Sequence, residues 1–102
     1  MDEDGFVRDF CLAGTHPVFA GHFPGQPLVP AVMLLEQVAL ALDAWRGQRL
    51  GAVLQAKFMA PLLPDESAQV VLSRVEAQPA RARFEIRRSG MVLAAGVVEG
   101  AA

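Results

Sequence analysis

Apolar side chains cover most sides of one segment of this chain, and that pattern predicts a helix. Over residues 31–46 the apolar positions recur at the spacing of helical turns, and coverage this wide is typical of a largely buried helix. The positions that carry this pattern are Val32, Met33, Leu35, Ala39, Leu40 and Leu42. Pro30 suits the entrance of the helix, and Gly47 and Gly51 suit its end.

Most of the remaining chain has the period of two that is typical of strands. It is clearest over residues 80–88, where small or apolar side chains alternate with charged ones. Further strands are predicted at 5–13, 52–60, 68–77 and 91–99, with turns at 61–66 and 89–90. This order predicts a single α+β domain over residues 1–102, in which an antiparallel sheet curves around one central helix.

The segment between the first strand and the helix has an unusual composition. Four prolines and three glycines fall within residues 14–30, which excludes a helix or a regular strand and predicts a shaped loop. His22 in this loop and Glu36 on the helix stand among few other charges. Each has an ordinary interpretation: His22 and His16 as solvated loop residues, and Glu36 as part of a polar helix face that Asp43 continues.

The same segment also fits a chemical site. No Ser, Thr or Asp caps the helix, so the amides near Ala31 and Val32 need partners, which are either water or a substrate carbonyl. A neutral His22 could accept a carbon-bound proton, the helix-start amides could stabilise the resulting oxyanion, and a protonated Glu36 could release a β-hydroxyl as water. Those steps dehydrate a 3-hydroxyacyl thioester.

Composition narrows the class of protein. Of the 102 residues, 53% are hydrophobic and 20% charged, which excludes a disordered chain and predicts a subunit interface or an apolar tunnel. A net charge of −2 provides no basic field for nucleic acid. Cys11 has no partner for an internal disulfide and is expected to be a small buried side chain. No signal peptide, membrane span, metal site or cofactor is expected, and the predicted location is cytoplasmic.

Residues 21–36, GHFPGQPLVPAVMLLE, resemble the signature G-H-F-P-G-x-P-x-x-P-G-V-L-x-x-E of the 3-hydroxyacyl-[acyl carrier protein] dehydratases. Residues 57–64, KFMAPLLP, are similar to their K/R-F-x-x-P-V-x-P segment. The resemblance implies the hot-dog fold, in which two subunits form one continuous sheet. It also implies that His22 acts as base, that Glu36 of the other subunit acts as acid, and that the Ala31 amide polarises the thioester carbonyl. The substrate would arrive on the phosphopantetheine of acyl carrier protein.

The chain departs from the family pattern near the expected site. Ala31 replaces the glycine that follows Pro30, and Leu40 replaces a glutamine four residues after the acid. Together with the short N-terminal segment, these departures suggest a divergent branch of the family. The short length and the His16-Pro17 lead-in resemble dehydratases of aryl-polyene or other secondary acyl pathways more than those of housekeeping fatty acid biosynthesis.

Two further sets of residues are expected to contact the substrate or its carrier. The acyl tunnel is expected to involve Phe19, Phe23, Val32, Met33 and Phe58, although each also suits an ordinary core. The docking surface for an acidic carrier protein is expected at Arg81, Arg83, Arg87 and Arg88, although these also suit a solvated strand face. A second basic group is formed by Arg46, Arg49 and Lys57, and no feature of the sequence decides which group lies beside the tunnel.

Three functions are consistent with these residues. The first is a homodimeric dehydratase, with further assembly left open. The second is a hot-dog thioesterase, which needs no histidine base. The third is a non-catalytic acyl-binding or pairing subunit of a heteromeric dehydratase.

Overall fold

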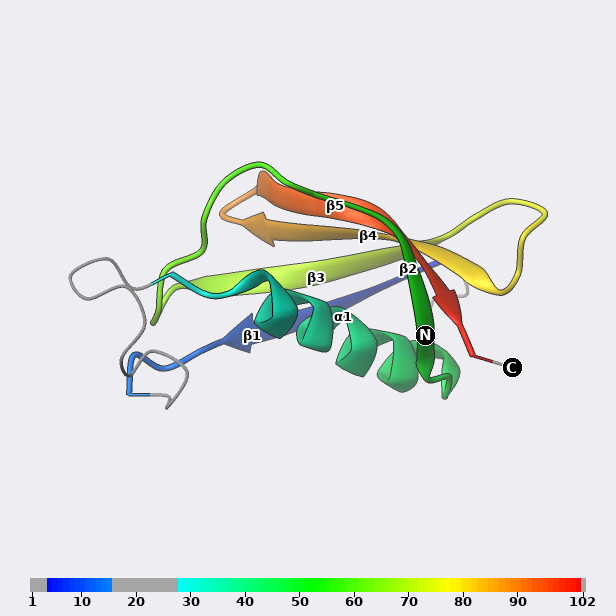
Figure 1. Cartoon of the computed structure of the whole chain (residues 1–102), viewed down its shortest axis with the longest axis horizontal. Helices are drawn as coiled ribbons and strands as arrows, with labels where there is room; N and C mark the ends of the chain where they lie inside the picture. Colours follow the sequence, from blue (N-terminus) through cyan, green and yellow to red (C-terminus); the bar gives the residue numbers. More distant parts are fainter. Residues whose placement is uncertain (1–3, 16–27, 102) are drawn as a thin grey trace.

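The computed structural model describes residues 4–15 and 28–101, and this part of the chain forms one helix and five strands (Figure 1). In order these are β1 (Gly5–Cys11), α1 (Ala31–Arg46), β2 (Leu50–Phe58), β3 (Ser67–Arg74), β4 (Arg81–Arg88) and β5 (Met91–Gly100). The helix has the bounds predicted from the sequence, and each predicted strand is present with ends shifted by no more than three residues.

The five strands form one antiparallel sheet in the order β1-β3-β4-β5-β2. Because β1 and β2 lie at opposite edges, the chain between them crosses one face of the sheet, and α1 lies in that connection (Figure 1). The sheet curves around the helix, which gives the α+β, hot-dog arrangement that the resemblance implied. The prediction of the fold class is therefore confirmed.

The core lies between α1 and the concave face of the sheet. The strand register places Leu72, Phe84 and Gly96 in one row across three strands. From the helix, Val38 and Leu42 are fully buried against this face. The alternation read from residues 80–88 is confirmed, since Ala82, Phe84 and Ile86 are buried and the intervening charged residues face outward.

Gly96 allows two neighbouring strands and an aromatic ring to approach closely. A Cβ at this position would overlap the carbonyl oxygen of Gln55 and the ring of Phe84. We therefore expect Gly96→Ala to lower the free energy of unfolding by about 1–3 kcal/mol, as overpacking does, in chemical denaturation. Gly47→Ala is the control, because its φ of 62° strains a side chain but no atom lies within 4 Å of the added Cβ. An unchanged free energy of unfolding in Gly96→Ala would contradict the packing explanation.

Two expectations about burial are wrong for the single chain. The helix buries only the face carrying Leu34, Gln37, Val38, Ala41, Leu42 and Trp45. Val32 is 69% exposed and Leu40 is 42% exposed, because a five-stranded sheet covers one side of the helix. Cys11 is exposed rather than buried, because it follows Phe10, which faces the helix, and alternation turns it outward.

Candidate active site

The start of α1 carries backbone amides that are available to a ligand. Pro30 precedes the helix with extended geometry (φ −62°, ψ 149°), and no side chain caps the end. The amides of Met33 and Leu34 donate to the Pro30 carbonyl at 3.0 and 3.3 Å. Among the described residues, the amides of Ala31 and Val32 have no acceptor. A helix start with free amides favours an oxygen that carries negative charge.

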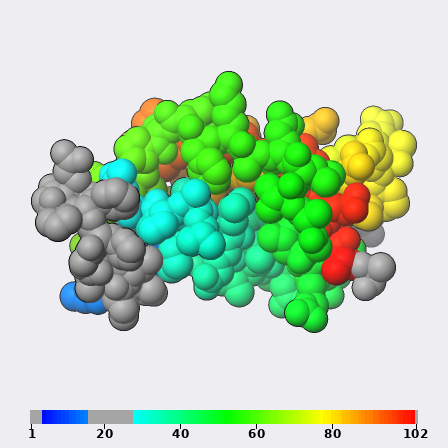
Figure 2. Space-filling view, viewed as in Figure 1, coloured from blue at the N-terminus to red at the C-terminus, as the bar shows by residue number. Residues whose placement is uncertain are grey.

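An apolar pocket of about 300 Å³ opens beside these amides. It is lined by Leu28, Val29, Ala31, Leu34, Phe58, Met59, Ala60, Pro61 and Leu62, none of which has a polar side chain. The amide of Val29 donates to the Leu62 carbonyl at 2.9 Å, which ties the approach to the helix to the loop after β2. In the space-filling view, α1 and the segment around β2 reach the same face of the molecule (Figure 2).

The far wall of the pocket is held by an ion pair. Glu66 accepts the amide proton of Leu63 at 2.8 Å and contacts Arg88 at 2.9 Å. The hydrogen bond from the Leu63 amide lowers the pKa of the Glu66 carboxyl most; desolvation opposes this effect, and the contact with Arg88 lowers the pKa further. Arg88 also donates to the Pro61 carbonyl at 3.2 Å, so the end of β4 anchors the loop that lines the pocket.

A larger hollow exists on another part of the surface, but its chemistry is less specific. It has a volume of about 660 Å³ and is lined by residues of β1, β3, the end of β4 and the turn before β5, including Asp9, Cys11 and Arg87. Unlike the smaller pocket, it has no uncapped helix start among its lining residues. The pocket beside Ala31 is therefore the better candidate for the site.

Glu36 does not reach the pocket of its own chain. It is exposed and is absent from the pocket lining. Five residues after Ala31 on a helix, it lies about 140° around the axis and about 7.5 Å along it. The carboxylate therefore projects from the face of α1 that the sheet leaves uncovered, where a second chain can meet it.

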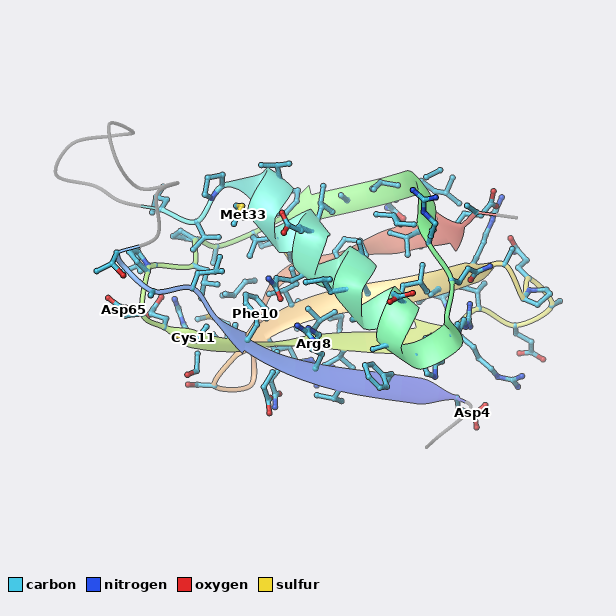
Figure 3. The ribbon with its side chains drawn as sticks, turned by 90° about the horizontal axis from the view of Figure 1, so that it is seen from below. Asp4, Arg8, Phe10, Cys11, Met33 and Asp65 are labelled. Atoms are coloured by element: carbon cyan, nitrogen blue, oxygen red, sulfur yellow. The ribbon has the colours of Figure 1, made fainter. Side chains whose placement is uncertain are left out.

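The structure places some of the predicted tunnel residues and not others. Phe58 lines the pocket beside Ala31. Val32 and Met33 are not among the lining residues: Val32 is exposed, and Met33 packs against the core at the N-terminal end of α1 (Figure 3). His22, Phe19 and Phe23 lie outside the described residues.

Sequence reasoning missed several lining residues. Leu28, Met59 and Leu62 lie within the two motifs but were not singled out. Leu28 lies two residues before Pro30 and Met59 directly follows Phe58, which was the available signal for these two. Gln37 was also missed: it is only 8% exposed, and its Oε1 has no hydrogen-bond partner within the described residues.

The four arginines expected to bind a carrier protein differ in their ion pairs. Arg81 contacts Glu99 at 3.2 Å, and Arg87 pairs with Glu85. Arg88 is held by Glu66, as described above. Arg83 has no ion-pair partner within the part of the chain that the structure describes. Three of the four charges are thus compensated within the chain.

The described residues contain no group of three or more His, Cys, Asp and Glu side chains placed to hold a metal ion. Across the same residues, α1 is neither long nor apolar enough to span a membrane, and no other helix qualifies.

Sequence comparisons point to dehydratases. A profile of the ApeI-like family, described as ApeI dehydratase, matches residues 1–97. The 3-hydroxyacyl-[acyl-carrier-protein] dehydratase FabZ of Clostridium acetobutylicum is 34% identical over 68 residues, covering 58% of this chain and 48% of that protein. The FabZ of Proteus mirabilis is 30% identical over 97 residues, covering 83% of this chain and 65% of that protein. The chain spans about half the length of the first of these curated relatives.

Solved structures share the fold. The dehydratase heterocomplex ApeI:P from Xenorhabdus doucetiae includes a chain with a TM-score of 0.84 and 21% identity, covering 99% of this chain and 90% of that one. Slr0204, a 1,4-dihydroxy-2-naphthoyl-CoA thioesterase from Synechocystis, gives a TM-score of 0.70 at 17% identity, covering 94% and 80%. Structural similarity at such low identity shows a common architecture and does not separate the two activities.

Proposed function

The chain belongs to the ApeI-like dehydratase family, and from that membership we propose that it removes water from 3-hydroxyacyl groups carried by acyl carrier protein. The product is the trans-2-enoyl thioester. The proposal is supported chiefly by the apolar pocket beside the Ala31 amide, which has no acceptor among the described residues. The pocket can hold an acyl chain while this amide binds the thioester oxygen.

The reaction needs a base, a stabilised oxyanion and an acid. The neutral imidazole of His22 takes a proton from the α-carbon, and the electron pair moves onto the thioester oxygen. The Ala31 amide hydrogen-bonds to this oxygen, where negative charge develops. The electrons then return, the bond from the β-carbon to its hydroxyl breaks, and the Glu36 carboxylic acid supplies the proton that lets the hydroxyl leave as water.

The site is proposed to form between two subunits. Glu36 projects away from the pocket of its own chain, so the acid that serves this pocket comes from the partner subunit. A pairing of β2 edges would bring it there, because β2 is an edge strand with apolar side chains exposed on it and just beyond it. These are Val53, Leu54, Phe58 and Met59. The other edge, β1, carries Arg8 and Asp9 and suits an apolar contact less well.

A second candidate function is a pairing subunit that supports a different active chain. It is favoured by the Xenorhabdus doucetiae relative, which is part of a dehydratase heterocomplex. In that case the same β2 edge and the same face of α1 would meet a different hot-dog chain. We also propose the pathway from the sequence resemblance alone: the protein acts in fatty acid or aryl-polyene biosynthesis.

Product analysis tests the proposed function. The purified chain is incubated with 3-hydroxyacyl carrier-protein thioesters of several chain lengths, and mass spectrometry follows the acyl group. Loss of one water with the thioester intact supports the dehydratase. Release of free 3-hydroxy acid would instead indicate a thioesterase, and activity that appears only on addition of a second hot-dog protein would indicate the pairing subunit.

A further inference from the structure

A shallow groove of about 440 Å³ crosses the outer face of the sheet, on the side away from α1. The strand register explains its shape, because two neighbouring rows of outward side chains cross four strands. One row holds Lys57, Ala95, Glu85 and Val71, and the next holds Gln55, Val97, Arg83 and Ser73. Small side chains on β5 thus lie between longer ones on β2 and β4, and the small side chains on β3 lie on the other side of β4, which leaves a hollow lined by charged residues.

The groove carries positive charge that no described residue of the chain compensates with an ion pair. The carboxylate of Glu85 already accepts a hydrogen bond from Arg87 Nε at 2.9 Å. Lys57 and Arg83 are exposed, and neither has an ion-pair partner among the described residues. With strands about 4.8 Å apart and the two rows offset by two residues, the backbone positions of Lys57 and Arg83 lie about 12 Å from each other. In a chain of net charge −2, this local excess favours an acidic partner.

The groove and the candidate active site share one lining residue. Met59 lines both the outer groove and the pocket beside Ala31, and it is 49% exposed. The amides of Met59 and Ala60 both donate to the Leu93 carbonyl, at 2.8 and 3.2 Å, which fixes the chain where it passes from one hollow to the other. A protein that occupies the groove therefore stands at the mouth of the pocket.

We propose that the acyl carrier protein docks in this groove, with its acidic side chains against Lys57 and Arg83. Its phosphopantetheine arm then passes Met59 to bring the thioester to the Ala31 amide. The inference rests on the proposed function and narrows it, since it selects Arg83 among the four arginines expected from the sequence and Lys57 from the second basic group.

The test reverses both charges and measures turnover of one acyl group on two different carriers. The variant is Lys57→Glu/Arg83→Glu, assayed with a 3-hydroxyacyl group on holo carrier protein and with the same acyl group on N-acetylcysteamine. We expect KM for the carrier-linked substrate to rise about tenfold or more, with kcat unchanged and a weaker dependence on salt. KM for the N-acetylcysteamine thioester should not change, because that substrate has no protein to dock.

Arg49→Glu is the control, because it reverses one exposed charge just before β2 begins, about 25 Å from Lys57 along the extended chain. It should leave both KM values unchanged. An unchanged KM for the carrier-linked substrate in the double variant, or an equal effect of Arg49→Glu, would overturn the inference. Binding of labelled holo carrier protein, measured by fluorescence anisotropy, tests the surface independently of turnover. If the chain binds carrier protein through Lys57 and Arg83 but dehydrates neither substrate, the proposed function is contradicted and the proposed docking surface is not.

Discussion

Replacing Glu36 with glutamine is expected to lower the rate of dehydration by roughly 10²–10⁴-fold, the range over which general acids contribute. Glutamine keeps the shape and hydrogen-bonding ability of the side chain but has no acidic proton to give to the leaving hydroxyl. Because Glu36 is exposed in its own chain, the substitution should leave the subunit folded. The measurement is kcat with a 3-hydroxyacyl thioester, alongside the far-ultraviolet circular dichroism spectrum.

Asp43→Asn is the control for this experiment. Asp43 is also exposed on α1, seven residues after Glu36 and therefore on nearly the same face. Its neutralisation should change the rate little. In the same assay His22→Ala is expected to lose activity by a similar factor, whereas His16→Ala should retain it. Near-native turnover by Glu36→Gln or His22→Ala would refute the assigned roles.

A mixture of two inactive variants is expected to recover activity if the site is shared between subunits. When His22→Ala and Glu36→Gln chains are mixed in equal amounts and allowed to exchange, about half of the dimers are mixed. Each mixed dimer has one site with both substitutions and one with neither. The mixture should therefore reach about one quarter of native activity, measured after unfolding and refolding the chains together.

The control mixture contains His22→Ala and the double variant His22→Ala/Glu36→Gln. No arrangement of these chains rebuilds a native site, so activity should stay at the background of the single variants. If the first mixture also stays at background while size-exclusion chromatography shows dimers, the acid and the base belong to one chain and the shared site is wrong.

The fold could be predicted almost completely because it depends on local patterns. The bounds of α1 follow from Pro30 before it and Gly47 after it. A glycine is favoured at position 47 because its φ of 62° is left-handed. The end of β3 was predicted three residues too late because the turn after Arg74 includes Ala77 with a φ of 63°, and no glycine marks that turn.

The site was less accessible to sequence reasoning because it depends on contacts between distant segments. The uncapped amides at Ala31 were predicted from the missing cap residue, and Phe58 from a motif. The role of Leu62 depends on its hydrogen bond with Val29 across 33 positions of sequence, which no local pattern indicates. The predicted burial of the helix failed for a related reason: an apolar pattern shows that a surface needs cover but does not show whether the same chain provides it.

The exposed edge formed by β2 also has a consequence for the newly made chain. An unpaired edge strand with apolar side chains is a template for indiscriminate association, and Lys57 is the only charged side chain on this one. Until β2 pairs with another subunit, the chain is therefore prone to aggregation, and this aggregation competes with assembly. The yield of folded protein should consequently depend on how fast partners meet, and the melting temperature should rise with protein concentration.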